Sequence, residues 1–322
     1  MSSYPRSAGH STFTRMQWRT AEVNDLGSLD PETLPLQAIP ITGEDVADVY
    51  VPLCSVLIQM ARSRPSRRST KDGSVGAKNL ESPFVIGVSG GVAAGKSACA
   101  ALLKALLEAV GTETGLPKVD LLCTDSFLYP NAVLEHLGLL RTKGFPDTYD
   151  VGRLLDAIVA VRSGESKVEV PVYSHAEYDI VDGARQTIEK PDILIVEGLN
   201  VLQPPPSAGT RGGLEIADLL DTSIYVDAAE ADMARWFAER LLALRALGPE
   251  DPSPFLRWFC SLSVAEAEAL ARRTWSEVNL VNLRLHVAPT CTRAEFILRC
   301  DARHRVSEVS VRSTSLSASM RL

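Results

Sequence analysis

Short apolar runs alternate with segments of helical periodicity through the middle of the chain. Runs rich in Val, Ile and Leu predict buried strands at residues 83–88, 119–123, 193–196 and 223–226. Helical spacing of apolar residues, or strong helix-forming composition, predicts helices at residues 46–60, 98–107, 151–161, 229–247 and 264–284. Two further strand-like runs follow at 294–298 and 306–311. This alternation predicts an α/β fold with a largely parallel sheet and helices on both faces.

A glycine-rich segment separates the first predicted strand from a strong helix-forming stretch. It reads Gly90-Gly91-Val92-Ala93-Ala94-Gly95-Lys96-Ser97 and matches the G-x-x-x-x-G-K-[ST] phosphate-binding loop. Its backbone N–H groups and the helix N-terminus form a cradle for anions, and Gly90 and Gly95 let the backbone approach phosphate oxygens. Lys96 is expected to reach the β- and γ-phosphates, and Ser97 to bind Mg²⁺. Because both flanks fit, we predict nucleoside triphosphate binding.

Two acidic residues follow predicted strands. Glu197 ends the run of four consecutive apolar residues at 193–196, which is typical of a central strand carrying a Walker-B acid. It would orient Mg²⁺-bound water or the acceptor hydroxyl. Asp125 follows the strand at 119–123, which is interpreted as a neighbour of the P-loop strand, so its side chain should face the ligand crevice. A general base, a Mg²⁺ ligand and an N-cap are equally good roles for it.

A cluster of polar aromatic residues follows an edge-like strand at 168–173 that contains Pro171. Tyr173, His175 and Tyr178 are predicted to lie on a loop. They are suited either to packing on a surface turn or to a small-molecule pocket with hydrogen-bonding walls. The residues alone favour the surface turn slightly.

Composition narrows the class of protein. The 322 residues are 45% hydrophobic with a net charge of −7, which argues against a general nucleic-acid or membrane-surface binder. Six scattered cysteines without a C-x-x-C pair are interpreted as reduced core thiols. No apolar run reaches the length of a membrane span, and the N-terminus lacks a secretory apolar region. We therefore expect a soluble, cytoplasmic protein.

The predicted domain organisation is simple. Residues 1–41, interrupted by three prolines, are expected to form a loosely ordered N-terminal arm, and residues 42–312 a domain of the P-loop NTPase type. Within it, residues 62–81 are a basic, Ser/Gly-rich stretch interpreted as a flexible, solvated linker. Residues 313–322 are a Ser-rich, frayed tail.

From about residue 42 to 312 the chain resembles the prokaryotic type I pantothenate kinases, relatives of uridine kinase and phosphoribulokinase. Eight stretches occur in the family's order and spacing, and those reading PVYSH and EGLNVLQ separate it from uridine kinases. These stretches are the P-loop, Thr124–Asn131, Lys143–Pro146, Pro171–His175 with Tyr178-Asp179, Pro191–Gln203, Ser223–Ala228, Trp236-Phe237-x-x-Arg240, and Trp275-x-x-x-Asn279 with Asn282-Leu283.

The resemblance implies ATP-dependent phosphorylation of the primary hydroxyl of pantothenate, the first step of coenzyme A synthesis. Asp125 then corresponds to the base that accepts the hydroxyl proton, and Arg240 to the cation that stabilises the transferring phosphoryl group. His304 matches a histidine that stacks on adenine. Pantothenate ligands correspond to Tyr173, His175, Tyr178 and Asn279. The family also implies ATP and Mg²⁺ as cofactors and a homodimer.

This chain departs from the family around the acceptor and the inhibitor. Phe237 replaces a tyrosine that contacts pantothenate, and Leu241 and Leu244 replace two phenylalanines of the pocket wall. Ala101 stands where relatives have an arginine that contacts the feedback inhibitor coenzyme A. We therefore expect weakened coenzyme A inhibition. The alternatives are a related kinase for a nucleoside, sugar phosphate or pantothenate analogue, and a non-catalytic ATP-binding paralogue.

Overall fold

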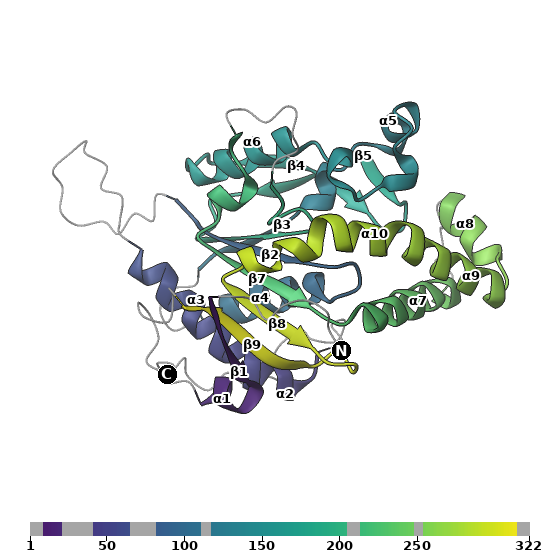
Figure 1. Cartoon of the computed structure of the whole chain (residues 1–322). Helices are drawn as coiled ribbons and strands as arrows, with labels where there is room; N and C mark the ends of the chain where they lie inside the picture. Colours follow the sequence, from purple (N-terminus) through teal and green to yellow (C-terminus); the bar gives the residue numbers. More distant parts are fainter. Residues whose placement is uncertain are drawn as a thin grey trace.

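A seven-stranded sheet forms the centre of the molecule (Figure 1). The computed structural model describes residues 9–20, 41–64, 82–110, 117–204, 213–247 and 254–313. The strand order is β1-β9-β8-β7-β2-β6-β3, in which β8 to β3 run parallel and β9 and β1 pair antiparallel at one edge. The strands are β1 His10–Thr14, β2 Phe84–Gly90, β3 Val119–Cys123, β6 Ile193–Glu197, β7 Thr222–Asp227, β8 Phe296–Cys300 and β9 Val306–Arg312. The predicted largely parallel sheet is confirmed.

The central strands β2 and β6 are buried along their whole length, as their unbroken apolar sequences predict. They pair in parallel, so that Val88 lies opposite Glu197 near the carboxyl ends. β3 pairs with β6, with Cys123 opposite Glu197. The interpretation of the 119–123 strand as a neighbour of the P-loop strand is therefore wrong, because β6 lies between the two. Glu197 is the acid on the strand next to the P-loop strand, and Asp125 follows the strand beyond.

Helices flank the sheet. α4 packs on β2, β3 and β6 and on α3, while α6 contacts the β4–β5 hairpin and the turn after β3. The α-helices are α1 Arg15–Arg19, α2 Gly43–Asp45, α3 Val51–Ser63, α4 Lys96–Val110, α5 Asn131–His136, α6 Val151–Arg162, α7 Glu230–Leu247, α8 Pro254–Ser261, α9 Val264–Thr274 and α10 Leu280–Asn282. All five predicted helical regions are present.

The chain departs from regular helix around residues 264–287. A single helix was predicted at 264–284, whereas π-helical turns at Trp275–Asn279 and Leu283–Val287 flank α10. α8 occupies residues expected to be a proline-containing connection, and it begins at Pro254, where the missing N–H is tolerated. In Figure 1, α7, α8 and α9 group together to one side of the sheet.

The N-terminal segment is more ordered than predicted. β1 pairs with β9 from His10↔Arg312 to Thr14↔Glu308, beside it in Figure 1. Trp18 on α1 is fully buried, and its Nε1 donates to the Val49 carbonyl at 3.1 Å. The expectation of a loosely ordered arm is therefore wrong for residues 10–19. Residues 1–8 and 21–40, most of the predicted linker (65–81) and the predicted tail from 314 onward lie outside the described residues.

A two-stranded antiparallel hairpin stands apart from the central sheet. It consists of β4 Val168–Ser174 and β5 Asp179–Ile188, the latter not predicted from the sequence. The proline in β4 is accommodated because this strand has only one partner. All six cysteines are free thiols, as predicted. Within the described part of the chain, no helix has the length and apolar character needed to span a membrane.

Candidate active site

The phosphate-binding loop connects β2 to α4, as its sequence predicts. Gly90 has φ +150°, and a Cβ there would lie 2.5 Å from the Val226 carbonyl oxygen of β7. Glycine is therefore required at this position because the backbone packs closely against the neighbouring strand. The sequence predicts glycine here for a different reason, namely that it lets the backbone approach phosphate. Ala93 adopts a left-handed conformation, with φ +64°. The Ala94 N–H donates to the Gly91 carbonyl at 3.2 Å, which closes the turn before α4.

Lys96 and Glu197 meet beside the loop. The Lys96 ammonium lies 3.7 Å from the Glu197 carboxylate, and both side chains are largely buried. Ser97, on the first turn of α4, is exposed. An exposed hydroxyl and a nearby carboxylate are oxygen ligands that suit Mg²⁺ bound together with nucleotide phosphates. Within the described residues, no group of three or more His, Cys, Asp or Glu side chains forms a metal site.

Asp125 lies on a single 3-10 turn, Thr124–Phe127, directly after β3. A Cβ on Gly198 would lie 1.8 Å from the Thr124 hydroxyl, so only glycine lets the turn after β6 approach this closely. The Tyr149 hydroxyl donates to Asp125 Oδ1 at 3.1 Å. Burial, followed by the Asp125 charge, raises the pKa of Tyr149 well above its ordinary value, so the phenol stays protonated as a donor. Asp125 is therefore a carboxylate held at one oxygen.

The polar aromatic cluster lies around the β4–β5 turn. The rings of Tyr173 and His175 are in edge-to-face contact, with centroids 5.2 Å apart. Tyr178 has a left-handed backbone, with φ +54°, and its side chain is partly exposed. Burial is the main cause that raises the pKa of Tyr173 and of Tyr178, and the Asp125 charge contributes to both shifts. The cluster therefore borders the Asp125 carboxylate, which favours the pocket over the surface turn.

Lys143 joins this cluster to the neighbouring helix. Its ammonium donates to Asn131 Oδ1 and to the Tyr178 carbonyl, both at 2.6 Å. The same nitrogen lies 5.0 Å from the ring centroid of Tyr173 and 4.4 Å from that of Tyr178. Burial lowers the pKa of Lys143 from 10.5 to about 8, against the opposing charges of Asp179 and Asp125. A buried cation thus holds the hairpin turn beside the carboxylate.

Helix α7 places two predicted residues in the site. Phe237 is buried, packs against Trp275 with centroids 6.0 Å apart, and carries the Arg240 guanidinium 5.9 Å from its ring centroid. Arg240 is exposed to solvent. Although its side chain reaches solvent, the protein packed around the guanidinium lowers the pKa of Arg240 by desolvation, and the charge of Asp125 opposes that shift. Arg240 and Asp125 therefore act on each other across the site.

His304 lies against both α7 and the phosphate-binding loop. Its ring stacks on Trp236 with centroids 3.6 Å apart and an interplanar angle of 10°. Burial lowers the pKa of His304, with polar backbone groups of Ala93 and Ala94 opposing the shift. Because the indole covers one face of the imidazole, a nucleotide base that stacks on His304 would use the other face.

Asn279 ends the π-helical turn that begins at Trp275. Its Nδ2 is buried without a hydrogen-bond partner among the described residues, as expected of a group awaiting a ligand. Three residues further on, the Asn282 amide donates to the Gly144 carbonyl at 2.7 Å. This helical run thus borders the site between Phe237 and the 143–146 segment.

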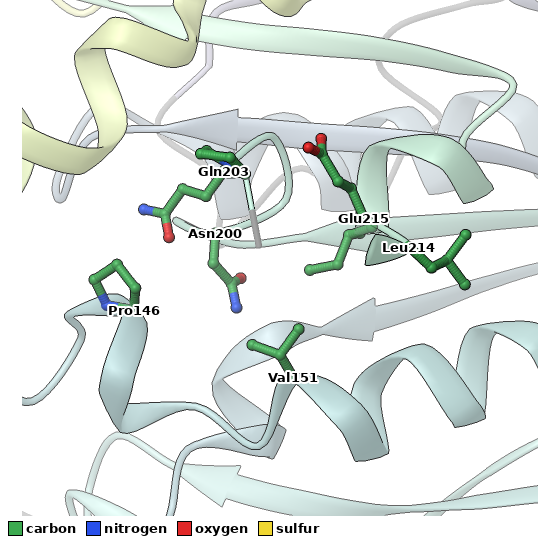
Figure 2. Close-up of a pocket in the computed structure, with 8 residues that line it drawn as sticks. Pro146, Val151, Asn200, Gln203, Leu214 and Glu215 are labelled. Atoms are coloured by element: carbon green, nitrogen blue, oxygen red, sulfur yellow. The ribbon is translucent and has the colours of Figure 1, made fainter. Parts of the chain in front are cut away.

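A separate, solvent-open pocket lies between α6 and the segment after β6. Figure 2 shows the amides of Asn200 and Gln203 pointing into the space beside Pro146 and Val151. Among the described residues, neither Asn200 amide atom has a hydrogen-bond partner, and the Gln203 nitrogen also lacks one. None of the predicted site residues lines this pocket.

The sequence argument named most of the residues around Asp125 and missed two. Tyr149 was not singled out, and Lys143 was quoted only as part of a matching stretch. The KGFP sequence at 143–146 was the available signal for Lys143, because a lysine before a Gly-Phe-Pro turn is held in a defined position. Tyr149 lacks such a signal, since its partner is 24 residues away.

Comparisons with known proteins agree with this geometry. Residues 85–238 match the model of the Phosphoribulokinase / Uridine kinase family. The chain is 44% identical to a pantothenate kinase of Leifsonia xyli subsp. xyli, over 85% of this chain and 83% of the relative. It is 41% identical to a pantothenate kinase of Clavibacter sepedonicus, over 96% and 97%. Among solved structures, the D-glycerate 3-kinase of Cryptococcus neoformans superposes with a TM-score of 0.55 at 12% identity, covering 79% of this chain and 96% of that chain, which bears on the fold alone.

Proposed function

The chain belongs to the pantothenate kinases, and we propose that it transfers the γ-phosphoryl group of ATP to the primary hydroxyl of pantothenate. The product is 4′-phosphopantothenate, and the reaction is the first step of coenzyme A synthesis. One observation supports the assignment to this site: the Tyr149 hydroxyl holds one oxygen of Asp125, on a turn that packs against Gly198, and the Asp125 charge acts on Tyr178 and Arg240. Asp125 can therefore contact an acceptor held between the aromatic cluster and a nucleotide on the loop.

The phosphate side of the reaction is assigned to the P-loop residues. Residues 90–97 would bind the ATP phosphates through backbone N–H groups, with Lys96 at the β- and γ-phosphates. Ser97 and Glu197 would hold Mg²⁺, which supplies charge neutralisation at the phosphates. The contact between Lys96 and Glu197 keeps both side chains at the end of β6.

The acceptor side is assigned to Asp125 and its neighbours. Asp125 takes the proton of the pantothenate hydroxyl while the hydroxyl oxygen forms a bond to the γ-phosphorus and the bond to the ADP oxygen breaks. Tyr149 holds one carboxylate oxygen and leaves the other for the acceptor. Arg240 stabilises charge on the transferring group. Binding of pantothenate falls to Tyr173, His175, Tyr178, Phe237 and Asn279, and of adenine to His304.

Assembly and regulation are proposed on the resemblance to the family. We expect a cytoplasmic homodimer, which light scattering would detect as twice the 34.8 kDa chain mass. We also expect coenzyme A to inhibit weakly, because Ala101 on α4 offers no cation to the inhibitor. Inhibition at concentrations typical of relatives would contradict this expectation.

The deciding experiment is a coupled ADP-release assay with MgATP and pantothenate, run on wild type and Asp125→Asn. We expect pantothenate-dependent turnover that falls by at least about 10²-fold in the variant, since general-base catalysis contributes about 10²–10⁴-fold. MgADP binding should be unchanged in Asp125→Asn, which separates loss of the base from loss of the fold. Nucleotide binding without turnover on pantothenate would redirect the proposal to another hydroxyl acceptor. Absence of turnover on every acceptor would indicate a non-catalytic ATP-binding protein.

A further inference from the structure

Helix α7 contacts the turn between β8 and β9 through two consecutive residues. Arg235 donates to the Ala302 carbonyl at 2.5 Å, and Trp236 stacks on His304. The Arg235 guanidinium also lies 5.7 Å from the Trp236 ring centroid. These contacts hold the turn against the helix at both ends of residues 302–304.

The turn itself has one conformation imposed by its own hydrogen bonds. The N–H groups of Arg303 and Arg305 donate to Asp301 Oδ1 at 2.8 and 3.0 Å, and the His304 N–H donates to the Asp301 carbonyl at 3.0 Å. His304 is left-handed, with φ +66°. A histidine in this region needs surrounding contacts to keep it there. The Trp236 stack is such a contact.

His304 in turn lies directly against the phosphate-binding loop. A Cβ on Gly95 would be 3.4 Å from its Nε2, and backbone groups of Ala93 and Ala94 act on the pKa of the ring, so the ring lies beside the loop backbone. The loop contains Ala93 in a left-handed conformation and Gly95 at φ +101°, both of which need support from outside the loop. The imidazole, which stacks on the indole and reaches the loop with its Nε2 edge, supplies that support.

We propose that Trp236 is a positioning residue for nucleotide binding, because its indole sets the His304 ring that braces residues 93–95 of the phosphate-binding loop. This inference rests on the proposed function, since it assigns a determinant of the same nucleotide site. It assigns no contact between Trp236 and the nucleotide. The effect is transmitted through His304 alone.

Substitutions on α7 should also affect nucleotide binding and acceptor binding separately. Phe237, the next residue along α7, packs on Trp275 and lies beneath the Arg240 guanidinium, whereas Trp236 packs on His304. Loss of the Trp236 stack should therefore weaken nucleotide binding while leaving the acceptor KM within about twofold. A merely structural role in α7 would change both quantities together.

The test measures MgADP binding by isothermal titration calorimetry for Trp236→Ala, Trp236→Phe, His304→Ala and the double variant Trp236→Ala/His304→Ala. A stacked aromatic pair is worth enough to change affinity by up to about tenfold. We expect Trp236→Ala to weaken MgADP binding about fivefold to tenfold and Trp236→Phe by less than about threefold, since phenylalanine still stacks. In the His304→Ala background, Trp236→Ala should add less than about twofold.

The controls use the chain's own residues. Trp258→Ala on α8 removes a half-exposed indole outside the site and should bind MgADP as wild type does. If Trp236→Ala does not fold, Arg235→Gln, which removes the exposed bond to Ala302, should weaken binding about twofold to threefold on its own. The inference is overturned if both Trp236→Ala and Arg235→Gln bind MgADP with wild-type affinity. It is also overturned if Trp236→Ala has the same effect with and without His304. In either case the proposed function still stands. Failure of the wild type to bind MgADP overturns the proposed function as well.

Discussion

Lys143 connects three parts of the acceptor side. It bonds to Asn131 at the start of α5 and to the backbone of Tyr178, and it lies over the rings of Tyr178 and Tyr173. A buried ammonium with two oxygen acceptors and two aromatic faces is strongly oriented. At the scale of single residues, the geometry of the pocket therefore depends on a cation as well as on the aromatics.

The charge of Lys143 should appear in the pH dependence of the reaction. A lysine is cationic below its pKa, and burial lowers that pKa to about 8, so the ammonium loses its proton as pH rises through 8. Because kcat/KM reports groups of the free enzyme, kcat/KM for pantothenate should fall above about pH 8.

Variants of Lys143 test this assignment. In Lys143→Met, kcat/KM should be lower by at least about tenfold, and the decline near pH 8 should disappear. The exposed Lys167 offers a matched control, because Lys167→Met should keep the wild-type profile. A wild-type profile that is flat to pH 9.5 would contradict the role of Lys143.

At Phe237, the addition of a single hydroxyl group should change the affinity for the acceptor. Its ring is buried beside Trp275 and Arg240, and the family resemblance implies a tyrosine in contact with pantothenate at this position. A neutral hydrogen bond contributes about 0.5–1.5 kcal/mol, so Phe237→Tyr should lower the KM for pantothenate by up to about tenfold. Steady-state kinetics at saturating ATP measures this, with kcat expected to stay unchanged. An unaltered or higher KM would mean that the new hydroxyl finds no acceptor on the substrate.

At the scale of elements, the N-terminal strand and helix complete the core. Trp18 is edge-to-face with Phe296 of β8, with centroids 6.5 Å apart. Arg15 pairs with Asp45 and Asp48, which ties α1 to the helix start at residue 43. The sequence of residues 1–41 predicts an arm because Pro31, Pro35 and Pro40 interrupt any long periodic pattern there.

Removal of the Trp18 indole should destabilise the whole domain. Truncation of a fully buried tryptophan costs about 3–5 kcal/mol, through lost burial and the cavity left behind. Urea unfolding of Trp18→Ala should therefore show a loss of that size in the free energy of unfolding. Met16→Ala on the same helix is the control, since Met16 is 79% exposed and its loss should change stability by no more than about 0.5 kcal/mol. Equal stability of the two variants would mean that α1 is detached in solution.

At the scale of the whole molecule, the six cysteines are distributed through the fold as separate thiols. Cys54 and Cys99 are fully buried, and burial raises the pKa of each thiol well above its ordinary value. Since the thiolate is the reactive form, these two groups should be inert in the native protein. The fold therefore relies on packing of its apolar core and needs no covalent cross-link.

Thiol titration checks this at the level of the intact chain. With 5,5′-dithiobis(2-nitrobenzoic acid), all six cysteines should react in denaturant without reductant, whereas Cys54 and Cys99 should remain unmodified in the folded state. The melting temperature should be the same with and without reductant. Fewer than six reactive thiols in the denatured, unreduced chain would indicate a disulfide and contradict the structure.

The sequence by itself determined the order and type of most elements, the phosphate-binding loop and the acid at the end of β6. These features depend on short spacings, namely a period of 2 or 3.6 residues and an eight-residue loop between a strand and a helix. Hairpin strand β5 was missed because its residues alternate between exposed and half-buried without a continuous apolar face. The N-terminal strand was missed because its pairing partner lies at the other end of the chain.

Only the tertiary structure decided which groups surround Asp125 and how β3 is placed. Tyr149, Lys143 and Arg240 come from separate segments. The Tyr149 hydroxyl bonds to the Asp125 carboxylate, and the charge of Asp125 acts on the pKa of the other two. Strand order is likewise a property of the packed sheet, since β6 enters between β2 and β3 late in the chain. Local periodicity encodes the elements, whereas contacts between distant segments, fixed by packing and desolvation, assemble the site.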